Sequence, residues 1–138
     1  MRILLDSDVT LDYILEREPF FEQAKEIFER YVNGEFVILV SAVSLTNIFY
    51  IVRKQKGKDT AFLAIKNLLI SIEICNVNKL ILQNALSLNF TDCEDAVQHT
   101  CAVENNLDAI VTRNLDDYKN ATMPVYAPAE YLKLFKQK

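Results

Sequence analysis

Short apolar runs recur along the chain, separated by longer segments with a different pattern. Ile3–Leu5, Phe36–Val40 and Ala109–Thr112 are mostly apolar, which is typical of strands buried on both faces of a parallel sheet. We predict two further strands, at Glu73–Val77 and, on an edge, at Val125–Tyr126. The clearest break between segments is Asn33-Gly34.

The intervening segments carry apolar residues at helical spacing. We predict helices at Val9–Leu15 (ending near Pro19), Phe20–Tyr31, Val43–Lys54, a segment after an Asp59 N-cap, Lys79–Leu88, Thr91–Asn105, and Ala129–Phe135 with Pro128 at its first position. Strands alternating with helices predict an α/β three-layer sandwich, in which helices flank a central, mostly parallel sheet. We expect one domain over residues 1–138.

Composition indicates the cellular compartment in which we expect the protein. With 51% hydrophobic residues the chain can bury a core, yet it has no apolar run of the roughly 20 residues that span a bilayer and no signal-peptide pattern. Cys75, Cys93 and Cys101 show no CxxC spacing, so we expect buried thiols in a reducing compartment. These features predict a cytoplasmic protein without a membrane partner.

Charge and glycine content bear on the classes of ligand. The net charge of −4 argues against non-specific nucleic-acid binding through bulk charge. Basic clusters at residues 53–58 and 133–138 are either solvated faces or local phosphate contacts. Gly34 and Gly57 are the only glycines, so the phosphate loops of nucleotide-binding domains are excluded.

Three acids follow predicted strands or begin a helix. Asp6 ends the first strand, and Asp95 lies in the first turn of a late helix. Asp117 lies with Asp116 in a predicted loop just beyond the last buried strand. If these strands are parallel neighbours, the three carboxylates converge at one sheet edge, where they repel unless something neutralises them, and buried charges are normally paired or bound to metals. Mg²⁺ or Mn²⁺ suits such oxygen ligands and could activate water near a phosphate. Alternatively, Asp6 and Asp8 merely end a strand and cap the next helix.

Three segments resemble one known family. LLDSDVTLDYIL, VSAVSLTNIFYIVRK and CEDAVQHTCAVENNLDAIVTRNLDDY follow one another in the order and spacing of the PIN-domain nucleases, in particular the VapC-type toxins of toxin–antitoxin pairs. The resemblance implies a Mg²⁺- or Mn²⁺-dependent endoribonuclease that cuts single-stranded RNA with a metal-activated water. It implies that Asp6, Asp95 and Asp117 bind the metal, with Asp116 a weaker match than Asp117.

The resemblance also implies partners. A toxin of this class would have a small antitoxin that fills or covers the cleft, and it would usually form a homodimer. The aromatic residues Phe20, Phe21 and Tyr31 would permit such a dimer if they are exposed.

One position departs from the family pattern. The family usually has a glutamate on the helix after the second strand, and this chain has Asn47 there. An amide offers an oxygen but neither a charge nor a base, so we expect Asn47 to complete the polar ring of a weaker site. Asp8, where the family often has asparagine, either restores the charge or caps a helix. A catalytically weakened PIN-fold module that binds RNA or a protein is therefore the alternative function.

Asp92, Asp95 and His99 fall at helical spacings of three and four. A carboxylate–histidine pair on this strip could bind a metal or relay a proton, but packing of His99 at the rim of the site is favoured, and stacking of its ring on a base is a further possibility. The helix dipole alone would also account for an acid at Asp92.

Thr112, Arg113 and Asn114 resemble the family's run beside the metal. Arg113 would either contact an RNA phosphate or balance nearby acids, and Asn114 would orient a ligand carboxylate. Asp12 either lines the cleft or lies on a solvated helix face, the second being favoured.

Overall fold

The computed structural model describes residues 1–135, so the last three residues of the C-terminal basic cluster lie outside the described part of the chain. Its elements are β1 (Arg2–Leu5), α1 (Ser7–Ile14), α2 (Phe21–Val32), β2 (Val37–Ser41), α3 (Ala42–Lys56), α4 (Lys58–Ser71), β3 (Glu73–Cys75), α5 (Lys79–Leu86), α6 (Cys93–Glu104), β4 (Ala109–Val111), the 3₁₀ helix η1 (Leu115–Tyr118), β5 (Val125–Tyr126) and α7 (Pro128–Lys133). No helix within residues 1–135 has both the length and the apolar character needed to cross a bilayer.

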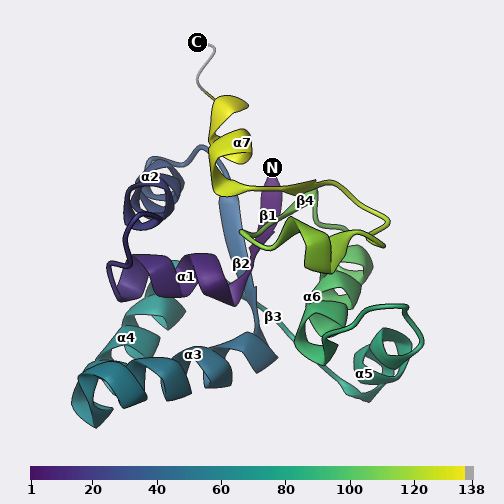
Figure 1. Ribbon diagram of the computed structural model, residues 1–138, viewed down its shortest axis with the longest axis horizontal. Helices are drawn as coiled ribbons and strands as arrows, with labels where there is room; N and C mark the ends of the chain where they lie inside the picture. Colours follow the sequence, from purple (N-terminus) through teal and green to yellow (C-terminus); the bar gives the residue numbers. More distant parts are fainter. Residues whose placement is uncertain (136–138) are drawn as a thin grey trace.

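The five strands form one sheet in the order β3-β2-β1-β4-β5, and every pairing is parallel. Strand β1 is central, with Leu4 paired to Leu39 of β2 and to Ile110 of β4. The predicted α/β sandwich with a central, mostly parallel sheet is confirmed, because helices cover both faces of this sheet (Figure 1).

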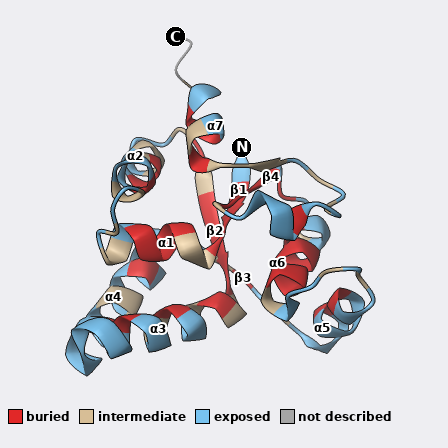
Figure 2. Ribbon diagram, in the orientation of Figure 1, coloured by how far each residue is buried: buried red, intermediate tan, exposed pale blue. Residues whose placement is uncertain are grey.

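Alternation along the strands divides the core into two layers. Ile3 and Leu5 of β1 pack on the side of α1, α2, α3, α4 and α7, whereas Leu4 packs on the side of α5 and α6. Successive residues of a strand point to opposite faces, so one short apolar run supplies both cores. Figure 2 shows buried residues along the helix faces turned toward the sheet.

Two local details differ from the sequence prediction. Gly57, with φ of +91°, is the N-cap of α4, so Asp59 lies in the first turn instead of capping the helix. A positive φ is readily adopted by glycine, which explains the break between α3 and α4. The segment with Asp116 and Asp117, predicted to be a loop, forms the short helix η1.

The carboxyl ends of the central strands bring polar residues together. Asp6 follows β1, Ser41 ends β2, and Thr112 follows β4; all three are buried. Helix α6 crosses beside them and is buried continuously from Asp95 to Ala102 (Figure 2). This edge of the sheet is the place where a ligand is expected in an open α/β fold.

Candidate active site

Asp6 is held at the end of β1 by both neighbouring elements. Its backbone N–H donates to the carbonyl of Val111 at 3.0 Å, which continues the ladder between β1 and β4. Its side chain is 4% exposed: Oδ1 accepts from Nε2 of Gln98 at 3.0 Å and Oδ2 from Oγ1 of Thr112 at 2.7 Å. Asp6 occupies the N-cap position of α1 without a side-chain capping bond, so its carboxylate is directed to the sheet edge and does not cap the helix.

Gln98 and Tyr118 connect Asp6 to Asp95. Gln98 has no exposed surface, and its Nε2 also donates to the hydroxyl of Tyr118 at 3.1 Å. That hydroxyl in turn donates to Oδ1 of Asp95 at 3.3 Å. The sequence analysis missed Gln98, although its spacing of three from Asp95 places both on one helix face.

Asp95 has a strongly perturbed acidity. Burial, followed by the charges of Asp6, Asp92 and Asp117, raises its pKa from 3.8 to about 7, and the bond from Tyr118 opposes this shift. Asp117 thus acts on Asp95 electrostatically, although its own side chain is exposed on η1. The structure brings Asp6 and Asp95 into one network and leaves Asp117 and Asp116 at the surface of a shallow hollow beside it.

Asp8 lies next to Asp6 in the first turn of α1. Burial, and then the charge of Asp6, raises its pKa to about 7, while the charge of Arg113 opposes the shift. Its Oδ2 accepts from Nδ2 of Asn114 at 2.8 Å, and its Oδ1 is buried without a hydrogen-bond partner in the described chain. The N-cap residue of α1 is Asp6 and not Asp8, so Asp8 adds to this edge a carboxylate with one oxygen that has no hydrogen bond in the described chain.

Asp12 differs from the prediction, which favoured a solvated helix face. Its side chain is 1% exposed. Nε and Nη2 of Arg113 lie 2.7 and 3.2 Å from its two oxygens, and Nε of Arg17 lies 2.9 Å from Oδ1. Arg113 also covers the ring of Phe20, 3.8 Å from its centroid. In this structure Arg113 therefore balances an acid, one of the two roles considered for it.

Asn47 and its helix carry no acid. The side chain of Asn47 is exposed and makes no hydrogen bond with any described residue. One turn earlier, the buried Ser44 lies 3.1 Å from Oε2 of Glu94. Glu94 is a second residue at this edge that was not predicted from the sequence, because the helix dipole alone accounts for an acid in the first turn of a helix.

Asp92 and His99, which lie at helical spacing from Asp95, have structural contacts. Asp92 is exposed and caps α6, accepting from the backbone N–H of Asp95 at 3.1 Å. His99 is 3% exposed, and its ring packs on Phe90, which in turn packs on Tyr118. Its Nε2 accepts from the backbone N–H of Thr122 at 3.0 Å, and burial lowers its pKa. Its ring is therefore closed to stacking with a base.

The cysteines are a partial correction. Cys75 and Cys101 are buried as expected, whereas Cys93 is exposed at the first position of α6. Cys93 is exposed because it enters the helix from a surface loop, directly after the exposed Asp92.

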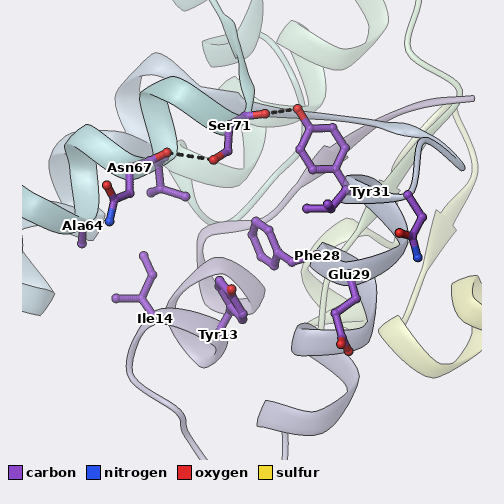
Figure 3. A pocket seen from close by; sticks show the side chains of 11 residues that line it. Tyr13, Ile14, Phe28, Glu29, Tyr31, Ala64, Asn67 and Ser71 are labelled. Carbon is purple, nitrogen blue, oxygen red and sulfur yellow. Dashed lines mark hydrogen bonds between the residues drawn. The ribbon is translucent and has the colours of Figure 1, made fainter.

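One hollow of the described chain lies away from the carboxylates. It measures about 570 Å³ and lies between α1, α2 and α4, where Tyr13, Phe28, Tyr31 and Leu68 form much of its wall (Figure 3). Tyr31 donates its hydroxyl to the carbonyl of Ser71 across it. This groove is mainly apolar, so the chemistry suggested by the acids belongs to the sheet edge and not to the groove.

No group of three or more His, Cys, Asp or Glu side chains within residues 1–135 is placed as a ready set of metal ligands. Of the three acids predicted to meet, Asp6 and Asp95 are joined in one hydrogen-bond network, and Asp117 makes no side-chain hydrogen bond to it in the described chain. Like charges repel one another, and Asp6 accepts its hydrogen bonds from the neutral donors Gln98 and Thr112.

Comparison with known proteins agrees with this architecture. A family model described as PIN domain matches residues 2–116, and no curated protein matches the chain in sequence. Among solved structures, DNA-bound VapBC from Salmonella typhimurium has a TM-score of 0.73 at 14% identity, covering 93% of this chain and 98% of that one.

Two further structures are similar. VapBC-1 from nontypeable Haemophilus influenzae has a TM-score of 0.68 at 13% identity, with coverage of 94% and 99%. VapC20 from Mycobacterium tuberculosis, a Sarcin-Ricin loop cleaving toxin, has a TM-score of 0.65 at 12% identity, with coverage of 78% and 86%. At such identities the likeness is one of fold.

Proposed function

Because the chain belongs to the PIN domain family, we propose that it is a Mg²⁺- or Mn²⁺-dependent endoribonuclease of the VapC type that cleaves single-stranded RNA. One observation carries this proposal. Asp6 and Asp95 are buried at the carboxyl edge of a parallel sheet and joined through Gln98 and Tyr118. No side chain within residues 1–135 forms an ion pair with either of them.

The donors at this edge suit a hard divalent cation. They are carboxylate oxygens, the ligands that Mg²⁺ and Mn²⁺ prefer. Oδ1 of Asp8 is buried with no partner in the described chain, a state that a nearby cation would relieve. We propose Asp6, Asp95 and Asp117 as the metal ligands, with Asn47 completing the polar ring.

The neutral residues around the acids have a positioning role in this proposal. Gln98 and Thr112 hold both oxygens of Asp6, and Asn114 holds one oxygen of Asp8. Such donors fix the orientation of a carboxylate without neutralising it. When bound, a divalent cation supplies activation of water and stabilisation of charge on the phosphate.

The partners follow from the same premise. Two of the similar structures are VapBC assemblies, which supports a small antitoxin as a partner, and we propose a cytoplasmic homodimer. Phe20, Phe21 and Tyr31, the aromatic residues considered for the dimer, are only half-exposed. The strongly exposed apolar residues lie elsewhere, for example Phe62, Leu63 and Ile70 on α4.

The test is cleavage of a fluorogenic single-stranded RNA during titration with Mg²⁺ or Mn²⁺. The native chain is expected to cleave, and Asp6→Asn is expected to lose cleavage to background. Asp59→Asn is the matched control, because Asp59 is an exposed acid on α4, and it should cleave like the native chain. Equal cleavage by the native chain and Asp6→Asn would refute the proposal.

A second function is favoured by the exposed Asn47, which leaves α3 without an acid. A weakened PIN-fold module would bind RNA or a protein without cutting RNA. Retention of the RNA by the native chain, with no cleavage at any concentration of either metal, would support the module over the enzyme.

A further inference from the structure

Helix α3 offers no carboxylate toward the sheet edge. Its sequence, AVSLTNIFYIVRKQK, contains neither aspartate nor glutamate. The buried Ser44 lies one turn before Asn47, and residues three apart on a helix share a face. A carboxylate that lies near Ser44 at this edge must therefore come from another element.

Glu94 of α6 reaches this place. Its Oε2 lies 3.1 Å from the hydroxyl of Ser44 and 3.3 Å from the hydroxyl of Ser7. The hydroxyl of Ser7 is also 3.4 Å from Oδ1 of Asp6. The carboxylates of Glu94 and Asp6 therefore flank one hydroxyl group.

Glu94 and Asp95 reach the edge by different routes although they are consecutive. Neighbouring helix residues do not face one another, and accordingly Asp95 meets Tyr118 whereas Glu94 meets Ser7 and Ser44. Together the two acids approach Asp6 from separate sides.

The charge of Glu94 is not balanced by its contacts. A serine hydroxyl has a single proton, and each of these has a competing acceptor: Asp6 for Ser7, and Oε1 of Gln98, at 3.2 Å, for Ser44. No described residue forms an ion pair with Glu94, and its Oε1 has no hydrogen bond within residues 1–135. One oxygen is thus fixed in position while the other remains available.

We propose that Glu94 supplies, from α6, the carboxylate that α3 lacks at Asn47, and that it binds the divalent cation together with Asp6 and Asp95. This inference rests on the proposed metal-dependent function. On this proposal, the chain has Asn47 on α3 because the carboxylate is supplied by Glu94 on α6, and the metal site is not lost.

The test measures Mn²⁺ binding by isothermal titration calorimetry, independently of RNA cleavage. Glu94→Gln keeps the shape and an acceptor oxygen for the serines, and it is expected to weaken Mn²⁺ binding by at least about tenfold, as loss of a ligand or its close support does. Glu104→Gln is the control with the same charge change, since Glu104 is exposed at the other end of α6. It should bind Mn²⁺ like the native chain.

A rescue variant distinguishes relocation of charge from a merely structural role. Asn47→Glu combined with Glu94→Gln restores one carboxylate from α3 and is expected to recover much of the lost affinity. Urea unfolding in EDTA should show both variants folded. Native affinity in Glu94→Gln would overturn the inference, as would an affinity loss that Asn47→Glu does not repair.

Asp6→Asn separates this inference from the proposed function. If Asp6→Asn abolishes Mn²⁺ binding while Glu94→Gln leaves it unchanged, the metal site stands and the role of Glu94 falls. If the native chain binds neither Mn²⁺ nor Mg²⁺, both fall together.

Discussion

Asp12 lies close in the chain to Asp6 and Asp8, but its negative charge is compensated in a different way from theirs. Asp12 is 1% exposed and is paired with Arg17 and Arg113. Earlier in the chain, Asp6 and Asp8 face Gln98, Thr112 and Asn114, which are neutral. The same short segment thus carries one acid with its counter-charge and two acids without any ion pair in the described chain.

This difference separates an acid that is paired within the chain from the acids that we propose to bind a metal. Burying a charge is costly unless it is paired, and Asp12 meets that condition within the chain. The acids at the sheet edge instead meet part of the cost by taking up protons, as the raised pKa values of Asp8 and Asp95 show. Under the proposed function, a bound divalent cation would supply the positive charge that these acids lack within the described chain.

The largest effect on this comparison is expected from Asp12→Ala. Removing one partner of a buried ion pair costs about 3 to 5 kcal/mol; the arginines are partly exposed, so we expect the lower end, near about 3 kcal/mol. Urea unfolding in EDTA measures this loss, with Asp59→Asn as the control. A loss below about 1 kcal/mol, the range of exposed pairs, would contradict the structural role of Asp12.

A smaller effect, visible as a dependence on pH, is expected at the sheet edge. The pKa of Asp95 rises from 3.8, the ordinary value of a solvated aspartate, to about 7 in the fold, so the folded protein binds the proton more tightly than the unfolded chain. The metal-free protein should therefore lose stability as pH rises from about 4 to about 7. Asp95→Asn, which does not titrate, should flatten this part of the profile.

Urea midpoints measured across this range in EDTA test the sign of the effect. Asp12→Asn is unsuitable as a control because it breaks the pairs with arginine, so Asp59→Asn serves again. A profile for Asp95→Asn as steep as that of the native chain would show that burial and repulsion at Asp95 do not govern the acidity of the edge.

The smallest effect is expected from Arg113→Lys. Lysine cannot reproduce the two-pronged contact with Asp12 or the packing on Phe20, but Arg17 continues to pair with Asp12. We expect a loss of about 1 kcal/mol in urea unfolding. If Arg113 instead serves chiefly as a phosphate contact, stability will be unchanged and affinity for single-stranded RNA will fall.

Much of the fold was accessible from the sequence because periodicity reports burial directly. The runs at Ile3–Leu5 and Phe36–Val40 are apolar because both faces of those strands are covered. The ends of helices were harder to predict. The N-cap of α4 is Gly57 instead of Asp59, because the chain adopts a positive φ at that position, and the composition does not reveal this.

The site was accessible only in part. Asp6 and Asp95 were predicted from their positions at a strand end and a helix start, whereas Asn114 was predicted from the resemblance of its segment to the PIN domains. Gln98 and Glu94 were not predicted to belong to the site. Whether they face Asp6 or solvent depends on the rotation of α6 about its axis, which the sequence does not give. The ion pair of Asp12 with Arg113 was not predicted either, because the two residues lie 101 positions apart in the chain and meet only in the fold.

The separation of Asp6 from its partners also bears on how the protein is made. Gln98 and Thr112 lie 92 and 106 residues beyond Asp6, so a growing chain has no organised sheet edge until nearly all of it has left the ribosome. Under the proposed ribonuclease function, the chain would therefore have no formed site through most of its own translation, and fragments released early would not cleave the messenger that encodes them.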